Sequence, residues 1–144
     1  IPSSVTNMAR CFYNCTSLTQ APEIPSSVTE MRYCFYCCRS LTQAQVISNG
    51  VTDMSFCFYG CANLTQAPVI PSGVTNMESC FSWCTNITAV TLKCKYVKDK
   101  FDRAFAYCEK LTTGSIKVPK GQLQTYRNNA YKMRANPDWF IADE

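Results

Sequence analysis

The chain has 144 residues, 47% of them hydrophobic and 17% charged, so it fits one domain with a core of its own and excludes a disordered composition. The net charge is +4 and is unevenly distributed. Residues 1–92 contain three basic and four acidic residues, whereas residues 93–144 contain eleven basic and six acidic ones. Acidic residues alternate with basic ones in this second part, which favours a solvated surface over a nucleic-acid interface. No apolar run approaches the roughly 20 residues of a membrane-spanning helix.

A period of 23 residues runs through the chain from its first residue. Isoleucine, valine, methionine, phenylalanine and leucine each recur with this spacing, as Ile1, Ile24, Ile47 and Ile70; Val5, Val28, Val51 and Val74; Met8, Met31, Met54 and Met77; Phe12, Phe35, Phe58 and Phe81; and Leu18, Leu41, Leu64 and then Ile87. A fifth unit follows one inserted residue, with Phe101, Ala104, Phe105, Cys108 and Leu111 in the matching places. A strict repeat of this length predicts an α/β repeat solenoid, in which stacked units bury ladders of equivalent side chains.

The second unit shows the elements expected within each repeat. Near the end of the first unit, residues 18–21 predict a short strand that pairs in parallel with its copies in the other units. At the start of the second unit, residues 24–27 predict a turn. Residues 28–31 are expected to be extended or turn-like. Apolar residues then follow at the i, i+3, i+4 and i+7 spacing of one helical face, which predicts one or two helical turns per repeat, of α or 3₁₀ type.

Two cysteines four residues apart mark that helical face in the first four units: Cys11 and Cys15, Cys34 and Cys38, Cys57 and Cys61, and Cys80 and Cys84. Ala104 takes the first place in unit five, so the position accepts any small apolar side chain, and we expect reduced thiols that pack in the core. A zinc or redox site is a weaker alternative, because the chain has no histidine and the spacing differs from common zinc motifs. Disulfides between ladder neighbours also stay open, because coils about 4.8 Å apart would allow them.

The last segment, residues 119–144, is expected to be a helical cap over the final repeat. Pro119 suits a helix start, and Leu123, Tyr126, Ala130 and Met133 recur at helical spacing. Trp139 and Phe140 would fold back after Pro137. The predicted organisation is therefore a solenoid over residues 1–118, divided into units 1–23, 24–46, 47–69, 70–92 and 93–118, followed by the cap.

The repeat I-P-x-x-V-T-x-M-x-x-C-F-x-x-C-x-x-L-T resembles the BspA-like leucine-rich repeats of bacterial surface proteins, over residues 1 to about 118. The segment from Ile116 to Gly121, with Tyr126 and Trp139 after it, is similar to the one that closes such arrays. The resemblance implies a leucine-rich-repeat fold and a bacterial protein at the cell surface or secreted. Separately, the first unit would leave a strand edge and the ladder ends at Val5, Met8 and Phe12 uncovered, so we expect further repeats of the same chain before residue 1.

No catalytic, cofactor or metal motif is present, so we expect a non-enzymatic protein without a cofactor. The resemblance implies a recognition or adhesion module for a protein or glycan on a host, the matrix or a neighbouring cell, without nucleic-acid or membrane insertion roles. A receptor-binding tip domain of a phage or appendage and a purely structural spacer are the alternatives. Two columns form the candidate binding surface: Thr19, Gln20, Thr42, Gln43, Thr65, Gln66 and Thr88 on the strand side, and Tyr13, Tyr36, Tyr59 and Trp83 on the predicted helices.

Overall fold

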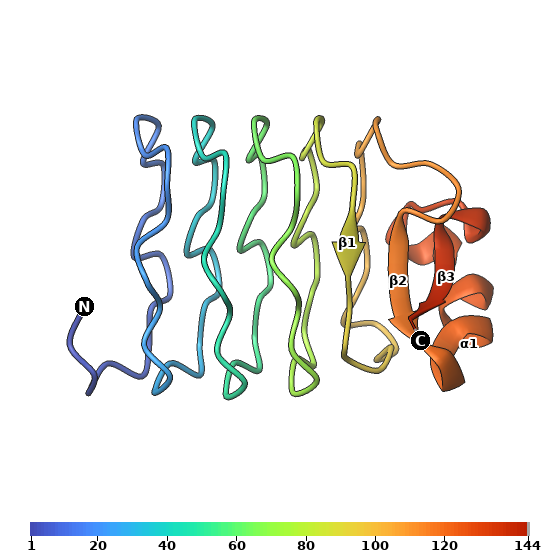
Figure 1. The fold of residues 1–144 in the computed structure, drawn as a ribbon, viewed down its shortest axis with the longest axis horizontal. Coiled ribbons are helices and arrows are strands. Elements are labelled where there is room, and N and C mark those ends of the chain that lie inside the picture. Colours follow the sequence, from blue (N-terminus) through green and yellow to red (C-terminus); the bar gives the residue numbers. More distant parts are fainter. Residues whose placement is uncertain (144) are drawn as a thin grey trace.

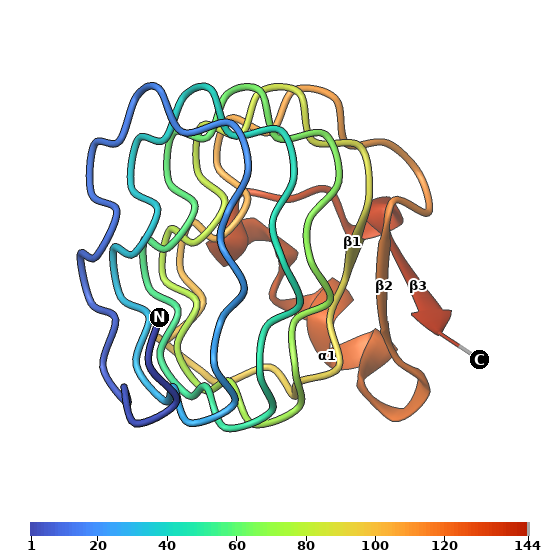
Figure 2. The same cartoon turned by 60° about the vertical axis from the view of Figure 1, so that its left-hand side comes forward.

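The computed structural model describes residues 1–143, which form a row of coils of similar outline, side by side from the N-terminus to the C-terminal segment (Figures 1 and 2). The strands are β1 (Val90–Thr91), β2 (Ile116–Pro119) and β3 (Phe140–Asp143), and they pair in parallel in the order β1-β2-β3. The α-helix is α1 (Leu123–Asn128), and 3₁₀ turns span Lys120–Gln122, Ala130–Met133 and Pro137–Trp139. The observed architecture is thus a repeat fold with a small parallel sheet near its C-terminal end.

The helices predicted within the repeats are wrong: no helix precedes Lys120 in the described residues, and consecutive turns take their place. In the first repeat the N–H groups of Met8, Arg10, Phe12 and Asn14 donate to carbonyls of the next coil, over 2.7–2.9 Å. The alternate N–H groups instead close i to i−3 turns within the coil, as Cys11 does to Met8 over 3.1 Å. Half of the backbone donors are therefore used between coils, which leaves too few for an α-helix.

Two positions in each turn segment adopt the left-handed backbone region, and this region is not compatible with a continuing right-handed helix. One set has φ between 50° and 60°: Arg10, Tyr33, Phe56, Ser79 and Arg103. The other set has φ between 56° and 73°: Asn14, Cys37, Gly60, Trp83 and Tyr107. The apolar spacing still identified the buried face, because Met31, Cys34, Phe35 and Cys38 are all at most 1% exposed.

The expected repeat strands are reduced mostly to single parallel bridges, such as Gln20 with Gln43 and Gln66 with Ala89. Pro22 and Pro68 follow two of these positions and have no N–H to extend the ladder. The fourth repeat has Thr91 in that place, and there the pairing lengthens into β1. A second line of bridges joins Asn7, Glu30, Asp53 and Asn76, which confirms the extended stretch before each turn segment. The turn predicted at residues 24–27 is present one residue further on, at residues 25–28, where the Val28 N–H donates to the Pro25 carbonyl.

A ladder of parallel phenylalanine rings forms the centre of the core. Neighbouring centroids lie 5.3 Å (Phe12 to Phe35), 5.5 Å (to Phe58), 5.6 Å (to Phe81) and 5.9 Å (to Phe105) apart, with planes within 9° of parallel. Offset stacking at these distances adds to the stabilisation from burial. The ladder ends at the cap, where Phe140 meets Phe105 edge-on at 6.3 Å.

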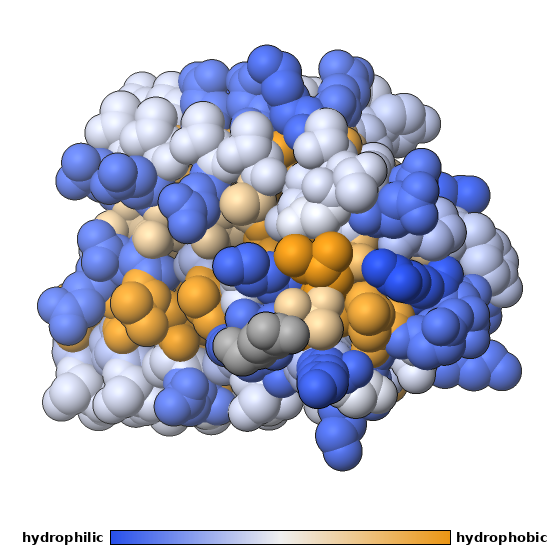
Figure 3. Space-filling model, turned by 45° about the vertical axis from the view of Figure 1, so that its right-hand side comes forward, coloured by the Kyte–Doolittle hydropathy of each residue, from blue (hydrophilic) through white to orange (hydrophobic). Residues whose placement is uncertain are grey.

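The segment predicted to be a helical cap has mixed secondary structure instead of being mainly helical. Helix α1 is only six residues long, and strand β3 follows it and extends the sheet by pairing with β2. The 3₁₀ turn at Ala130–Met133 continues the turn ladder, because the Phe105 N–H donates to the Met133 carbonyl over 3.0 Å. Tyr126, Ala130, Met133 and Phe140 are fully buried, and the outer surface of this end is mainly hydrophilic (Figure 3).

Candidate ligand-binding surface

The turn side of the coils carries two columns of aromatic rings. Tyr13, Tyr36 and Tyr59 stack with centroids 4.8 Å apart and planes within 8° of parallel. Beside them Tyr33 and Phe56 stack at 4.7 Å, and the Arg10 guanidinium lies 4.9 Å from the centre of the Tyr33 ring. Tyr13 is 42% exposed and the other rings of these columns are half-buried, so the columns form a rigid, solvent-facing aromatic surface.

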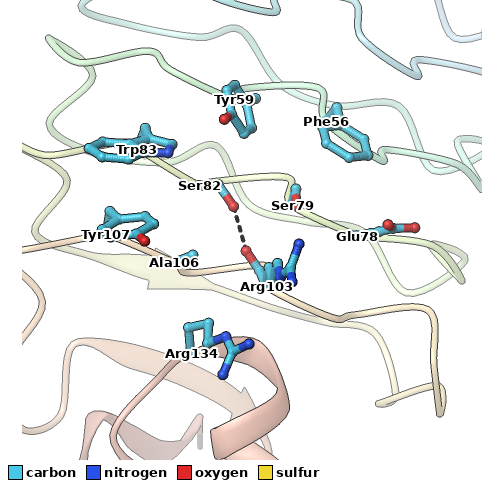
Figure 4. Close-up of a pocket in the computed structure, with 10 residues that line it drawn as sticks. All are labelled: Phe56, Tyr59, Glu78, Ser79, Ser82, Trp83, Arg103, Ala106, Tyr107 and Arg134. Carbon is cyan, nitrogen blue, oxygen red and sulfur yellow. Dashed lines mark hydrogen bonds between the residues drawn. The ribbon is translucent and has the colours of Figure 1, made fainter.

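Both columns stop at the fourth repeat, because small side chains replace the rings. Counting 23 residues on from Tyr59 gives Ser82, and from Phe56 gives Ser79; Ala106 follows in the place of Ser82 in the fifth repeat. The result is a pocket of about 680 Å³ at the end of the columns (Figure 4). This volume is within the range of small-molecule sites.

A second aromatic pair borders this pocket on another side. Trp83 and Tyr107 occupy the left-handed position that holds Gly60 one repeat earlier, and their rings stack at 4.0 Å with planes 15° apart. They are 43% and 59% exposed. Trp83 therefore lies next to the tyrosine column but does not belong to it, because it is one residue out of register with Tyr59.

Three charged side chains complete the pocket: Glu78, Arg103 and Arg134. Arg134 comes from the cap, and Figure 4 shows it on the same side of the pocket as Arg103. Within residues 1–143, neither guanidinium lies within 4 Å of a carboxylate; the ion pairs join Lys93 to Asp143 and Lys132 to Asp99 instead. The Ser82 hydroxyl is already used, because it donates to the Arg103 carbonyl.

The predicted threonine and glutamine column lies apart from this pocket. Thr19, Thr42, Thr65 and Thr88 are exposed as expected, but the Thr42 and Thr88 hydroxyls donate to the threonine carbonyl one coil back over 3.1 Å. Gln66 and Thr88 line a separate hollow of about 360 Å³ beside β1 and β2. Of the predicted surface residues, the structure thus brings only Tyr59 and Trp83 together in the main pocket.

Sequence reasoning missed most of the pocket, namely Phe56, Glu78, Ser79, Ser82, Arg103, Ala106, Tyr107 and Arg134. A signal was available in the repeat itself, where the fourth unit reads M-E-S-C-F-S-W-C against M-S-F-C-F-Y-G-C in the third. The loss of an aromatic residue at two aligned positions at once marks a hollow on an otherwise filled surface. The contribution of Arg134 from the cap has no such signal.

All eleven cysteines are free thiols, and burial raises the pKa of most of them, to about 11 for Cys38 and about 12 for Cys108. The expectation that Cys11 is buried with the rest of its ladder is wrong: Cys11 is exposed, because its coil has a neighbour on one side only. Cys94, in the inserted stretch, is buried against the Tyr126 hydroxyl at 3.7 Å.

In residues 1–143 no three Cys, Asp or Glu side chains are grouped to hold a metal ion.

No helix within the described part of the chain has the length and apolar character needed to span a membrane.

Comparison with known proteins identifies the repeat family. A family model described as a BspA type leucine rich repeat region in six copies matches residues 5–136. The division into five units and a cap at residue 119 is not tested by this match and stays a prediction. No curated protein matches the chain.

Among solved structures, a leucine-rich repeat protein from Bacteroides ovatus is similar, with a TM-score of 0.49 and 23% identity over 81% of this chain. The match spans 36% of the length of that protein. Because the family model covers most of the sequence, the chain belongs to the BspA-type leucine-rich repeat family.

Proposed function

We propose that the chain is a non-enzymatic recognition module of a bacterial cell-surface or secreted protein, and that it binds a protein or glycan through its aromatic turn side. The main support is the register of the exposed rings. Tyr13, Tyr36 and Tyr59 are held by mutual stacking, so a ligand that contacts them orders few additional side chains. Tyr, Trp and Arg are also the residues that contribute most at binding interfaces.

The aromatic side is a better candidate than the threonine and glutamine side. The hydroxyls of Thr42 and Thr88 are engaged with neighbouring coils, which makes that column part of the stacking of the repeats. The aromatic columns instead end in a pocket with three charged side chains that have no ion-pair partner in residues 1–143. We propose host, matrix or neighbouring-cell components as the partners, with further repeats of the same chain next to the first coil.

A two-sided mutational comparison tests this function. One variant carries Tyr13→Ala and Tyr36→Ala on the aromatic side, and the matched control carries Gln20→Ala and Gln43→Ala on the strand side. Each is applied to arrays of matrix proteins and of glycans, after far-ultraviolet circular dichroism has shown that it folds. We expect the first variant to lose at least tenfold in binding to the ligands that the unmodified chain captures, and the control to keep its binding.

The other outcomes point elsewhere. Loss only in the glutamine variant would move recognition to the strand side. A chain that captures nothing on either array, at micromolar concentration, would contradict the recognition function and favour the structural spacer. Selective capture of bacterial surface components would favour the receptor-binding tip of a phage or appendage.

A further inference from the structure

The pocket at the end of the aromatic columns has two ring faces among its walls. Tyr59 stacks on Tyr36 with one face, and the next position of its column is Ser82. Phe56 stacks in the same way on Tyr33, and the next position of its column is Ser79. The opposite faces of Tyr59 and Phe56 therefore border the pocket, side by side with centroids 5.8 Å apart. Because the two rings are tilted by 38°, a flat ring placed over Ser82 would continue the tyrosine stack and meet Phe56 at its edge.

The charge of the pocket favours an anionic ligand. Arg103 and Arg134 outnumber Glu78, and the ion pairs within residues 1–143 leave both guanidiniums without a carboxylate. Planar guanidiniums bind carboxylates through paired, charge-assisted hydrogen bonds. Because the two arginines come from the fifth repeat and the cap, they lie on the side of the pocket opposite the tyrosine column (Figure 4).

The remaining polar groups favour a sugar over an aromatic side chain of a peptide. The Glu78 carboxylate only accepts hydrogen bonds, and no group in the described residues donates to it; the Ser79 hydroxyl likewise has no partner there. A pyranose ring supplies hydroxyl donors and acceptors around its edge and an apolar C–H face for stacking. An aromatic side chain would stack equally well, but its edge offers no hydroxyl to the Ser79 hydroxyl or to the Glu78 carboxylate, which is exposed and would keep its water instead.

We propose that this pocket binds an acidic saccharide. The pyranose ring stacks on Tyr59 and touches Phe56 with its edge, its carboxylate pairs with Arg103 and Arg134, and its hydroxyls contact Glu78 and Ser79. This inference rests on the proposed recognition function and gives the chemical class of one ligand at that surface.

The test is calorimetric titration of the 144-residue chain with uronic-acid and sialic-acid oligosaccharides and with the carboxyl-reduced counterpart of each. A peptide that ends in tyrosine with a free carboxylate is the third probe. We expect an acidic oligosaccharide to bind at least tenfold more tightly than its reduced counterpart and than the peptide, because the carboxylate is what the arginines recognise. Arg103→Gln and Arg134→Gln should each weaken that binding about tenfold, and raised salt should weaken it further.

Arg39→Gln is the matched control, because Arg39 is exposed and does not line the pocket; its affinity should equal that of the unmodified chain. Equal binding of acidic and reduced sugars, unchanged affinity in both arginine variants, or no binding of any acidic sugar would overturn the proposal. Preferred binding of the peptide would overturn it in favour of a protein terminus. In each of these cases the array comparison of the tyrosine and glutamine variants still decides the recognition function separately.

Discussion

At the scale of single residues, the two cysteine ladders differ in what their thiols do. In the second ladder the sulfurs of Cys38, Cys61, Cys84 and Cys108 donate to phenylalanine carbonyls one coil back, over 3.0–3.2 Å. No such bond is made by the first ladder in the described residues, and Ala104 occupies its last place. From the second unit to the fifth, the second cysteine therefore makes a hydrogen bond that alanine could not make, whereas the first cysteine is replaceable.

The first prediction contrasts Phe58→Ala with Cys57→Ala, at two neighbouring residues that are both fully buried. Phe58→Ala interrupts the ring ladder and should lower the free energy of unfolding by about 3–5 kcal/mol, the usual cost of emptying a core aromatic site. Cys57→Ala should cost clearly less, because the fifth repeat already packs alanine there. Urea unfolding curves measure both, and equal losses would show that the ring ladder is not the centre of the core.

The second prediction concerns the thiol hydrogen bonds. Cys61→Ala removes the sulfur that donates to the Phe35 carbonyl over 3.2 Å, whereas Cys57→Ala removes a sulfur of the same size without such a bond. Cys61→Ala should therefore be the less stable of the two by up to about 1 kcal/mol, the net value of a typical hydrogen bond. Cys61→Ser, which keeps a donor, should recover part of the loss in the same urea experiment. The reverse order of the two alanine variants would contradict this role.

At the scale of elements, the sequence predicts what is buried better than it predicts the backbone. A residue spacing of three and four brings side chains to one side of a helix, but consecutive turns bury the same side chains. The choice between them depends on the next coil, whose carbonyls take the N–H of Met8, Arg10 and Phe12. Periodicity within one unit contains no information on such bonds between units. The same limit applies to the pocket, whose Arg134 comes from the C-terminal segment, where the 23-residue spacing of the five predicted units does not continue.

The third prediction separates a turn from a helix at Cys37, which has φ of 56°. Gly60 takes the same position one repeat later, so Cys37→Gly should change the free energy of unfolding by less than about 1 kcal/mol. Cys37→Val should cost about 1–2 kcal/mol more than glycine, because a β-branched residue is strained in the left-handed region. A helix would give the opposite order, since glycine is the poorer helix former. Chemical unfolding of both variants decides between the two backbones.

At the scale of the whole molecule, the buried thiols couple stability to alkaline pH. Burial raises the pKa of Cys38 to about 11 and of Cys108 to about 12, and it raises those of Cys57 and Cys84 well above their ordinary value. In the unfolded chain these thiols ionise near their ordinary value of 9.0, so above that pH the folded state binds more protons than the unfolded state. The stability is thus complete below about pH 9 and is lost as pH rises through the folded pKa values.

The fourth prediction follows from this linkage. Urea midpoints measured in reductant should be nearly constant from pH 7 to pH 8 and should fall from pH 9 to pH 11. The fall should be shallower in Cys84→Ala, because that variant has one buried thiol fewer to ionise on unfolding. Tyrosine and lysine titrate in the same range but are identical in both proteins, so the difference in slope isolates the thiol. Equal slopes would mean that the cysteine ladder does not set the alkaline limit.

The fifth prediction concerns the cap, since a row of coils must end without exposing its apolar ladder or an unpaired strand. Strand β3 pairs with β2 from Ile116 to Pro119, and Phe140 covers the last ring of the phenylalanine ladder at 6.3 Å from Phe105. Deletion of residues 119–144 should therefore cause unfolding or aggregation, measured by circular dichroism and light scattering. The point variant Phe140→Asp should reproduce much of this loss, because it places a charge at a fully buried position.

Ile141→Asp serves as the matched control for that variant, because Ile141 lies on the same strand but is only half-buried. The Ile141→Asp variant keeps the pairing of β3 with β2, and its Phe140 still covers the phenylalanine ladder. Its melting temperature should therefore be close to that of the unmodified chain. The difference between the two aspartate variants measures the cover that Phe140 gives to the ladder, apart from strand pairing. A truncated chain that stays monomeric and unfolds at the same urea concentration as the full one would show that the last coil needs no cover.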